Sequence, residues 1–369
     1  MNTPAKALIA MSGGIDSSIA AYMMKKTGYD CLGMTMKLMG DCSGSDEKFK
    51  VAGEYYRFIS PDEYTEEASA SARIASRIGI PFKAIDFSGA FRKHVMRRFV
   101  SAYEDGRTPN PCVDCNKHIK FGMLLDLALE MGFDFLVTGH YARITRDEES
   151  GLYRLRKALD KTRDQSYFLF NLTQSRLSHI MFPLGDYHKS DIRKLASELS
   201  LENTERKESR DICFVPDGDY GVFLESFTGH EYAGGEFITA DGKCPGHHKG
   251  AVRYTIGQRK GLGLSVPSPV YVLGKDMASN RVFVGEEALL FGKEMTISDV
   301  NWTSVRPLSE PFRCRIKIRF RQSPASALCQ PNGSGTIKVF FDEPQRAITP
   351  GQAAVMYDGD IVIGGGVIV

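Results

Sequence analysis

Short apolar runs alternate with longer amphipathic stretches along the first two hundred residues of the chain. Apolar runs between turn residues predict buried strands, and apolar positions three and four residues apart predict helices. The predicted strands are residues 6–11, 29–37, 81–86 and 135–138. The predicted helices are residues 17–27, 65–78, 88–103, 122–131, 177–180 and 190–199. This alternation predicts βαβ units, and therefore an α/β fold with a parallel sheet that carries helices on both faces.

The pattern changes near Asp217, where the chain becomes rich in glycine and loses its long helical periodicity. After about Glu294 short alternating segments follow, at residues 312–320, 336–341 and 353–357, with a Gly-broken apolar hairpin at 359–369. Such segments are typical of a small antiparallel barrel or sandwich, and we expect a β-barrel. The expected domains are residues 1–216, a small central domain at 217–291 and the barrel at 292–369. Residues 43–63 are expected to form a flexible insertion.

The composition is that of a multidomain globular protein. The 369 residues are 42% hydrophobic and 25% charged, and a chain of this length predicts two or three domains. Lys and Arg number 47 against 45 Asp and Glu, so the net charge of +2 excludes a uniformly basic surface but allows a local basic face. No apolar stretch approaches the roughly 20 residues of a membrane span, and no signal peptide is recognised. Eight cysteines are too few for a disulfide scaffold, which favours a reducing cytoplasm and no membrane partner.

The segment S-G-G-I-D-S-S, residues 12–18, joins the first predicted strand to the first predicted helix. Its glycines let the backbone approach an anion closely, and the helix start supplies unpaired N–H groups. Asp16 is a candidate ligand for Mg²⁺ bound to the phosphates. The alternative is a capped helix after a tight turn, because Ser, Gly and Asp are common there. Seven such residues directly after a buried strand favour a phosphate-binding loop, although it lacks both the Walker A and the G-x-G-x-x-G spacing.

This segment also resembles the pyrophosphate loop of the N-type ATP pyrophosphatases, whose signature is S-G-G-x-D-S. The resemblance implies cleavage of ATP between its α and β phosphates and adenylation of a carbonyl-type oxygen. Synthetases for small metabolites and sulfur-inserting tRNA enzymes share the loop. The loop alone therefore indicates activation chemistry without defining the substrate.

Cys112 and Cys115 lie in the segment T-P-N-P-C-V-D-C-N-K at residues 108–117. Two prolines predict an extended segment that brings these thiols to the start of the following helix. A thiol near a helix start and beside Lys117 is expected to ionise easily. A third thiol, Cys213, follows Arg210 and precedes an apolar stretch. The remaining cysteines are interpreted as core or surface residues without a chemical role: Cys31, Cys42, Cys244, Cys314 and Cys329.

The C-x-x-C pair has three interpretations. Half of a structural zinc site is the weakest, because no second C-x-x-C or spaced histidine pair completes it. A thioredoxin-like redox pair is disfavoured by the flanking prolines. The third interpretation is sulfur transfer, in which one cysteine carries sulfur and another releases it by forming a disulfide.

The chain closely resembles the bacterial tRNA-specific 2-thiouridylases, which convert the wobble uridine of certain tRNAs to 2-thiouridine. The resemblance spans nearly the whole chain and rests on motifs at residues 11–18, 108–121 (T-P-N-P-x-x-x-C-N-x-x-I-K-F), 138–143 (T-G-H-Y-A-R), 160–172 (D-K-x-x-D-Q-S-Y-F-L), 211–214, 248–250, 254–262 (Y-T-I-G-Q-R-K-G-L) and 349–352. It implies an ATP pyrophosphatase domain, with ATP and Mg²⁺ as cofactors. It also implies tRNA as a partner, together with a persulfide relay protein or a cysteine desulfurase.

By the same resemblance Cys115 aligns with the nucleophile and Cys213 with the persulfide-bearing cysteine. The ATP-contacting positions align with Ala10, Met11, Ser12, Gly13, Gly14, Ile15, Asp16, Ser17, Met36 and Gly139. The positions that line the target base or approach tRNA align with Asn110, Pro111, Cys112, His140, Arg163, Asp164, Gln165, Arg319, Phe320 and Gln352. Many members have Asp where this chain has Cys112. With that thiol present, Cys112, Cys115 and Cys213 are also a candidate ligand set for a [4Fe-4S] cluster, and the choice between persulfide relay and cluster stays open.

Basic residues concentrate in two places, which are expected to be local RNA-binding surfaces although an ordinary solvated face is the common alternative. Alternation places Arg313, Arg315, Lys317 and Arg319 on one side of a predicted strand that Arg306 and Arg321 flank. A second group comprises Arg92, Lys93, Arg97 and Arg98. Two other functions remain as alternatives: an ATP pyrophosphatase that adenylates a small metabolite, and a non-catalytic RNA-binding protein.

Overall fold

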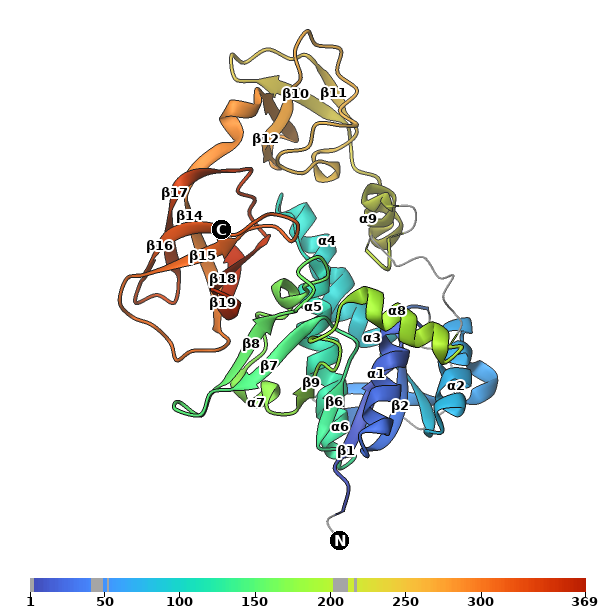
Figure 1. The fold of residues 1–369 in the computed structure, drawn as a ribbon. Coiled ribbons are helices and arrows are strands. Elements are labelled where there is room, and N and C mark those ends of the chain that lie inside the picture. Colours follow the sequence, from blue (N-terminus) through green and yellow to red (C-terminus); the bar gives the residue numbers. More distant parts are fainter. Residues whose placement is uncertain (1–2, 41–48, 52, 202–211, 216–217) are drawn as a thin grey trace.

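The structure is a computed structural model that describes residues 3–40, 49–51, 53–201, 212–215 and 218–369. Three parts follow one another along the chain in Figure 1: an α/β domain, a small central domain at the top of the view, and a β-barrel. Among the residues described, no helix has the length and apolar character needed to cross a membrane. The predicted fold class, an α/β domain followed by a central domain and a C-terminal barrel, is confirmed.

The α/β domain is built on a seven-stranded sheet with the order β3-β4-β5-β2-β1-β6-β9. Neighbours from β5 to β9 pair in parallel, while β4 runs antiparallel to β5 and forms a hairpin with β3. The strands are β1 (Lys6–Ala10), β2 (Asp30–Lys37), β3 (Phe49–Val51), β4 (Glu54–Ile59), β5 (Phe82–Asp86), β6 (Phe135–Val137) and β9 (Ile180–Met181). The chain adds β2 on one side of β1 and β6 on the other, so the order reverses beside β1.

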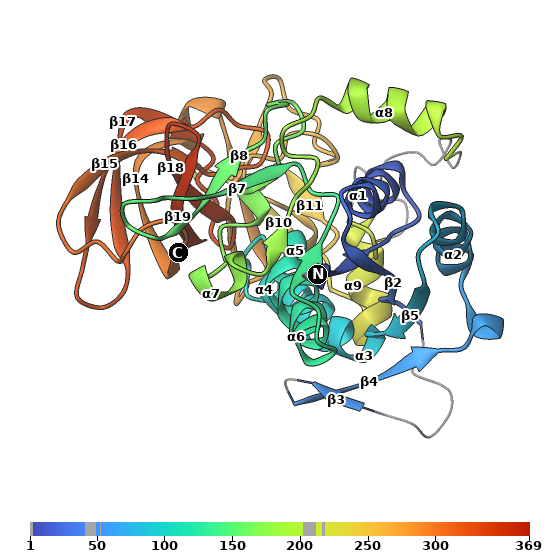
Figure 2. The same ribbon diagram turned by 60° about the horizontal axis from the view of Figure 1, so that its bottom comes forward.

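Helices cover both faces of this sheet, because successive residues of a strand point to opposite faces. Ala7 and Ile9 of β1 pack in one buried cluster, whereas Leu8 packs in another. The first cluster includes residues of α1 (Ile15–Lys26), α2 (Glu66–Ile78) and α8 (Lys189–Glu198). The second includes residues of α3 (Ser88–Phe91), the π-helical segment Arg92–Met96, α4 (Arg97–Glu104), α5 (Pro111–Asp114), the π-helical segment Cys115–Leu124 and α6 (Leu125–Glu130). Figure 2 shows α1, α2 and α8 opposite α3, α4 and α6.

Two expectations about this domain were wrong, and a third, the flexible insertion at 43–63, falls partly outside the described residues. The cysteine-bearing helix begins at Pro111 instead of 122, because proline suits the first position of a helix, where its missing N–H is not needed. Residues 177–180 are no helix: α7 (Gln174–Leu177) ends there and β9 follows. Where residues 43–63 are described, they form the β3–β4 hairpin and a 3₁₀ turn at Pro61–Glu63, and β4 pairs with β5.

The central domain has one helix, α9 (Tyr220–Thr228), and a four-stranded sheet of order β11-β10-β13-β12. Its strands are β10 (Gly235–Thr239), β11 (Gly246–His248), β12 (Tyr271–Asp276) and β13 (Arg281–Gly285). A 3₁₀ turn at Ala251–Arg253 lies within it, and another at Glu287–Leu290 leads to the barrel. Its small core includes Phe237, Val272 and Val282.

Six antiparallel strands close into the C-terminal barrel in the order β14-β17-β16-β15-β18-β19, with β19 pairing back to β14. They are β14 (Phe291–Trp302), β15 (Phe312–Lys317), β16 (Ala325–Pro331), β17 (Ile337–Arg346), β18 (Ala353–Asp358) and β19 (Ile361–Ile368). The end of the chain is therefore one strand paired with β18, not a separate hairpin. Two strands of the α/β domain, β7 (Ala142–Arg146) and β8 (Tyr153–Lys157), extend this sheet, because β8 pairs with β19. The sequence pattern did not predict either.

Candidate active site

The predicted phosphate loop lies at the carboxyl-terminal edge of the parallel sheet. It leaves the end of β1, and Met36 and Gly139 lie at the corresponding ends of β2 and β6. This edge, where the strand order reverses, is where open α/β sheets bind ligands. The predicted ATP-contacting positions are therefore brought together along one edge, from 10–17 to Met36 and Gly139.

Hydrogen bonds fix the shape of this loop. The Ser12 N–H donates to Ser17 Oγ at 3.1 Å, and the Ser17 and Ser18 hydroxyls donate to the Gly14 carbonyl oxygen at 3.0 and 2.9 Å. Gly13 has φ +74°, a conformation that a side chain would strain. The Gly14 cap of α1 makes no side-chain hydrogen bond, so the first turn keeps N–H groups for an anion.

Asp16 is held by two side chains from distant parts of the chain. The Tyr141 hydroxyl donates to Asp16 Oδ1 at 2.8 Å, and Lys189 Nζ lies 2.8 and 2.7 Å from Oδ1 and Oδ2. Lys189 is buried at the first position of α8. That Asp16 holds Mg²⁺ against the phosphates stays a prediction; in this structure the Lys189 ammonium balances the charge of the carboxylate. The loop suits a polyphosphate, since no side chain caps the N–H groups of the first turn of α1.

The segment that carries the C-x-x-C pair is tied to the barrel. The Thr108 N–H donates to the Pro350 carbonyl oxygen at 2.9 Å. Gln352 Nε2 donates to the carbonyl oxygens of Thr108 and Pro109 at 2.9 and 3.3 Å. Asn110 then stands at the N-cap position of the helix that Pro111 begins, without a side-chain capping hydrogen bond. Gln352, predicted to approach tRNA, thus holds the segment that precedes the cysteines.

Both cysteines lie within the helix that begins at Pro111. Cys112 is exposed and Cys115 is half-buried, at the junction of α5 with the π-helical segment. Between them, Asp114 Oδ1 accepts a hydrogen bond from Arg98 Nε at 3.2 Å. Cys213 is exposed, and its neighbour Phe214 packs with Phe91, Phe99 and Phe223 at ring-centroid distances of 5.6, 5.3 and 5.0 Å. This aromatic cluster anchors the backbone that presents Cys213.

The three thiols lie near enough to affect one another electrostatically. Burial raises the pKa of the Cys115 thiol to about 11; the Lys120 ammonium opposes this, while Cys213 and Cys112 add to it. Although Cys112 and Cys213 keep exposed surface, desolvation by the surrounding protein also raises the pKa of each, and Lys120 lowers it. The expectation of easy ionisation was therefore wrong: desolvation outweighs the helix start, and the nearby cation is Lys120, not Lys117.

The donor set bears on which metal fits here. Three cysteines match the ligands of an iron–sulfur cluster with one open position. A single Zn²⁺ would need its ligand atoms much closer together. Within the part of the chain that the structure describes, three-ligand groups with all atoms within 4.8 Å do not include these cysteines. The arrangement disfavours a mononuclear zinc site and is compatible with a larger cluster or with no metal.

Several predicted tRNA contacts are internal in the structure. His140 is buried between Phe121 and Phe182, and its Nδ1 lies 2.7 Å from the Thr138 hydroxyl. Burial lowers the pKa of His140 well below its usual value, so the ring is neutral. Asp164 is also buried, where it accepts hydrogen bonds from the Ala158 and Ser166 backbone and from the Ser166 hydroxyl. The assignment of both to an RNA-facing surface is corrected: they stabilise the interior.

The other predicted contacts are half-buried. Gln165 exchanges hydrogen bonds with the Tyr141 backbone, while Arg163 lies in the adjacent turn. Arg319 Nη2 donates to the carbonyl oxygens of Ile256 and Ala347, at 3.0 and 3.2 Å, and to Thr349 Oγ1 at 2.9 Å. Phe320 packs against Phe168 with ring centroids 4.4 Å apart and the ring planes tilted by 40°. Arg319 therefore ties the barrel to the central domain.

The basic groups are only partly as predicted. Arg313 and Arg315 of β15 are exposed and alternate with buried residues, but β15 ends at Lys317, so Arg319 is not part of the strand. Arg313 pairs with Asp342 at 2.7 Å, and Lys317 lies over the Phe320 ring. In the second group Arg92, Lys93, Arg97 and Arg98 are all exposed, and Arg98 reaches Asp114 beside the cysteines.

Sequence reasoning missed Tyr141, Lys189 and Lys120. Tyr141 and Lys120 stand inside motifs that the resemblance uses, but neither motif says what the side chain contacts. Lys189 opens a helix at an ordinary position for a surface lysine. The cysteines interpreted as bystanders are partly core residues: Cys314 and Cys329 meet inside the barrel with their sulfurs 3.5 Å apart. Cys31 is buried, Cys244 is exposed, and Cys42 lies outside the described residues.

Comparison with known families covers nearly the whole chain. Residues 5–217 match a model described as the tRNA methyl transferase HUP domain, residues 222–286 the PRC-barrel domain of the same name, and residues 292–368 the aminomethyltransferase beta-barrel domain. A protein of Clostridioides difficile named tRNA-specific 2-thiouridylase MnmA is 42% identical over 363 residues, which cover 98% of each chain. A protein of Magnetococcus marinus with the same name is 42% identical over 369 residues, the whole of both chains. This chain belongs to the tRNA-specific 2-thiouridylase family, whose members are tRNA sulfurtransferases.

Proposed function

We propose that this protein thiolates carbon 2 of the wobble uridine in tRNA and uses ATP to activate the carbonyl oxygen. One observation carries the proposal: the fold brings Cys213 near Cys112 and Cys115, although about one hundred residues separate it from them in the sequence, because its neighbours Ile212 and Phe214 pack in the same hydrophobic cluster as Cys115. Sulfur relay needs two thiols within reach of each other, whereas neither adenylation of a metabolite nor RNA binding does.

The phosphate loop supports the activation step. Uridine's carbonyl oxygen is a poor leaving group, and adenylation turns it into AMP with release of pyrophosphate. The N–H groups of the first turn of α1, with the Ser12 hydroxyl, are placed to stabilise the departing phosphates. The Lys189 ammonium balances the charge of Asp16, so this carboxylate repels the phosphates less. Mg²⁺ would arrive bound to ATP and supply Lewis-acid chemistry at the phosphates.

Sulfur transfer then divides between two cysteines. A persulfide on Cys213, loaded by a relay protein or a cysteine desulfurase, attacks carbon 2 with its terminal sulfur, and AMP leaves. The Cys115 thiolate attacks the inner sulfur of Cys213, which breaks the bond to the transferred sulfur and releases 2-thiouridine. The products are thiolated tRNA and a Cys115–Cys213 disulfide. A two-electron thiol reductant restores both thiols.

Cys112 distinguishes this relay from a second mechanism. With Cys115 and Cys213 it completes three ligands for a [4Fe-4S] cluster, which would present sulfide from its open iron site. In the relay Cys112 only lines the pocket for the base. The two mechanisms therefore differ in whether Cys112 is required.

The test uses the full chain purified anaerobically, with unmodified tRNA, ATP, Mg²⁺ and a persulfide donor. Pyrophosphate release and 2-thiouridine, the latter by mass spectrometry, are measured for Cys115→Ser, Cys213→Ser and Cys112→Ser, with the buried Cys31→Ala as control. We expect the first two variants to lose thiolation but keep tRNA-dependent pyrophosphate release. Complete loss in Cys112→Ser, together with iron and labile sulfide in the wild type, would replace the relay with the cluster. Thiolation by Cys115→Ser at the wild-type rate would refute both.

A further inference from the structure

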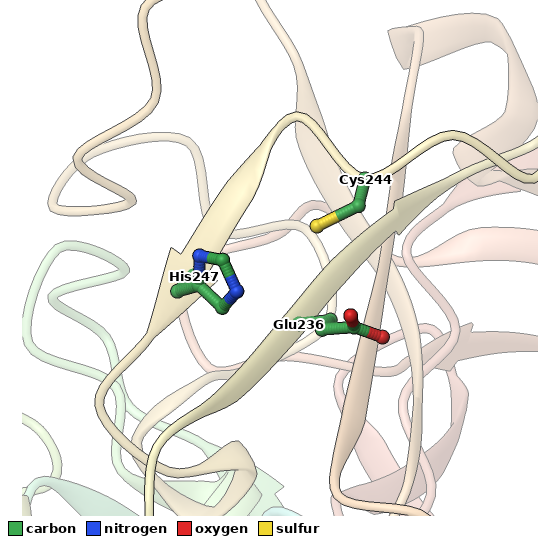
Figure 3. A group of neighbouring side chains, drawn as sticks. All are labelled: Glu236, Cys244 and His247. Carbon is green, nitrogen blue, oxygen red and sulfur yellow. The ribbon is translucent and has the colours of Figure 1, made fainter.

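A glutamate, a cysteine and a histidine lie together on the outer face of the central domain (Figure 3). Glu236 is in β10 and His247 is in β11, and antiparallel pairing places them directly opposite each other. Cys244 lies in the turn that joins the two strands. One ligand atom from each, a carboxylate oxygen, the thiol sulfur and an imidazole nitrogen, lies within 4.8 Å of the other two.

The fold of the hairpin brings these side chains to one side. Phe237 and His248 are buried, so strand alternation turns their neighbours Glu236 and His247 away from the core. Residues directly opposite on antiparallel strands have Cβ atoms about 5 Å apart. The turn is closed by the Thr239 N–H, which donates to the Lys243 carbonyl oxygen at 2.9 Å.

The ligand atoms are accessible and only weakly engaged by protein partners. The Cys244 thiol donates one hydrogen bond, at 3.3 Å, to the Gly246 carbonyl oxygen, which leaves the sulfur lone pairs free of donors in this contact. Arg281 Nε is 3.8 Å from Glu236 Oε2, which is beyond hydrogen-bond length. His247 and Cys244 are exposed and Glu236 is half-buried, so an ion from solvent reaches all three.

We propose that Glu236, Cys244 and His247 form a site for Zn²⁺. Sulfur, imidazole nitrogen and carboxylate oxygen are the three donor types that Zn²⁺ uses, and a thiolate excludes Mg²⁺ and Ca²⁺ as preferred occupants. The Glu236 carboxylate and the Cys244 thiolate together balance the charge of the ion. Three protein ligands leave the fourth tetrahedral position to solvent. Cys244 thereby gains a role that its sequence context did not indicate, independent of sulfur transfer.

Bound Zn²⁺ joins the turn to both strands, since its ligands come from β10, β11 and the residues between them. Ligand atoms that lie up to 4.8 Å apart must move closer by about 1 Å to reach bond lengths of about 2.0–2.3 Å around one ion. Rotation of exposed side chains supplies such a movement at little cost. Binding also removes the thiol proton, so affinity rises with pH.

The test measures Zn²⁺ binding to the full chain by competition with a chromophoric chelator. To remove the other thiols that take metal, all measurements use a background in which Cys112, Cys115 and Cys213 are serine. We expect the background protein to bind one equivalent of Zn²⁺. Its affinity should be at least 100-fold weaker in Cys244→Ser, His247→Gln and Glu236→Gln, a larger loss than is usual when a residue that only supports a metal ligand is replaced. His230→Gln, an exposed histidine of the same domain outside the cluster, is the matched control and should bind like the background protein.

A second measurement removes doubt about misfolded variants. Hydrogen exchange at the amides of β10, β11 and their turn should slow when Zn²⁺ is added to the background protein and to His230→Gln, but not in His247→Gln. The proposal is overturned if the background protein binds no Zn²⁺, or if Cys244→Ser and His247→Gln bind it as tightly as His230→Gln does. Because thiolation is not measured, failure here leaves the proposed function untouched, and loss of thiolation leaves this site untouched.

Discussion

Gly139 lies so close to the phosphate loop that a single methyl group added at this glycine is expected to displace the loop. A Cβ added at Gly139 would lie 2.8 Å from the Asp16 carbonyl carbon and 2.8 Å from the Ser17 nitrogen. Ordinary contacts begin at 3.4 Å, so the first turn of α1 must retreat by the difference of 0.6 Å between 3.4 and 2.8 Å. Both contacts are with backbone, which cannot rotate away as a side chain can.

Overpacking of this kind costs about 1–3 kcal/mol. The cost is shared between the stability of the fold and the geometry of the loop. About half of the cost, roughly 0.5–1.5 kcal/mol, falls on the loop, and because 1.4 kcal/mol corresponds to a factor of about ten, the Gly139→Ala substitution should raise the KM for ATP by about 2- to 10-fold. The melting temperature should fall by a few degrees.

The assay is tRNA-dependent pyrophosphate release at varied ATP, with thermal unfolding of the same preparations. Gly333→Ala is the matched control, because a Cβ there meets nothing within 4 Å and the residue has no left-handed backbone angle. If Gly139→Ala and Gly333→Ala have the same KM for ATP and the same melting temperature, the backbone around Gly139 moves to accept the methyl group at little cost. The reasoning that this close approach shapes the nucleotide site would then be wrong.

Three further changes test other contacts. Gln352→Ala removes the two hydrogen bonds to the segment before the cysteines, worth about 1 kcal/mol each. It should lower kcat for thiolation about 5- to 30-fold without changing the KM for ATP. The control Gln322→Ala, on the same barrel, should leave kcat unchanged. Lys120→Met should raise the pKa of Cys115 above about 11, because it removes the cation that favours the thiolate. Alkylation of Cys115 by iodoacetamide should then slow about 3- to 10-fold at any pH below that value. The control Lys117→Met should leave the alkylation rate unchanged. Burial lowers the pKa of Lys275 from 10.5 to about 8, so between these two values the folded protein binds fewer protons than the unfolded chain and gains stability as the pH rises. At pH 7 Lys275→Met should therefore raise the free energy of unfolding by up to about 3 kcal/mol. Chemical denaturation of this variant should show a smaller rise of stability with pH.

Local sequence signals predicted most of the α/β domain, because the spacing of apolar residues within each strand or helix indicates which of its faces is buried. The helix predicted at 65–78 ends at Gly79, which is the left-handed cap of α2. The start of the cysteine helix was missed because proline is typical both of an extended segment and of the first position of a helix, and the local sequence does not decide between them. Strand β7 pairs with β8, and β8 joins the barrel sheet through β19, which lies about two hundred residues further along the chain, so no local pattern places this hairpin.

The candidate site was less predictable than the fold. The residue types and motifs indicated which cysteines and which loop to consider, but contacts across long sequence separations determine their chemistry. Lys189 is 173 residues from Asp16, and no local pattern pairs them. The pKa of Cys115 was predicted in the wrong direction because desolvation depends on how many protein atoms surround the thiol, which a sequence does not show.

The barrel is a structural part of the candidate active site, because it holds the segment before the cysteines. Its loop accepts the Thr108 N–H through Pro350 and donates to the same segment through Gln352. On the other side of the loop, Arg319 bonds to Ile256 of the central domain. A force on either outer domain is therefore transmitted to the backbone immediately before Cys112. We therefore expect binding of tRNA to alter the position of Cys115, and a truncated chain that ends before β14 should lose the position of that segment even where the α/β domain folds.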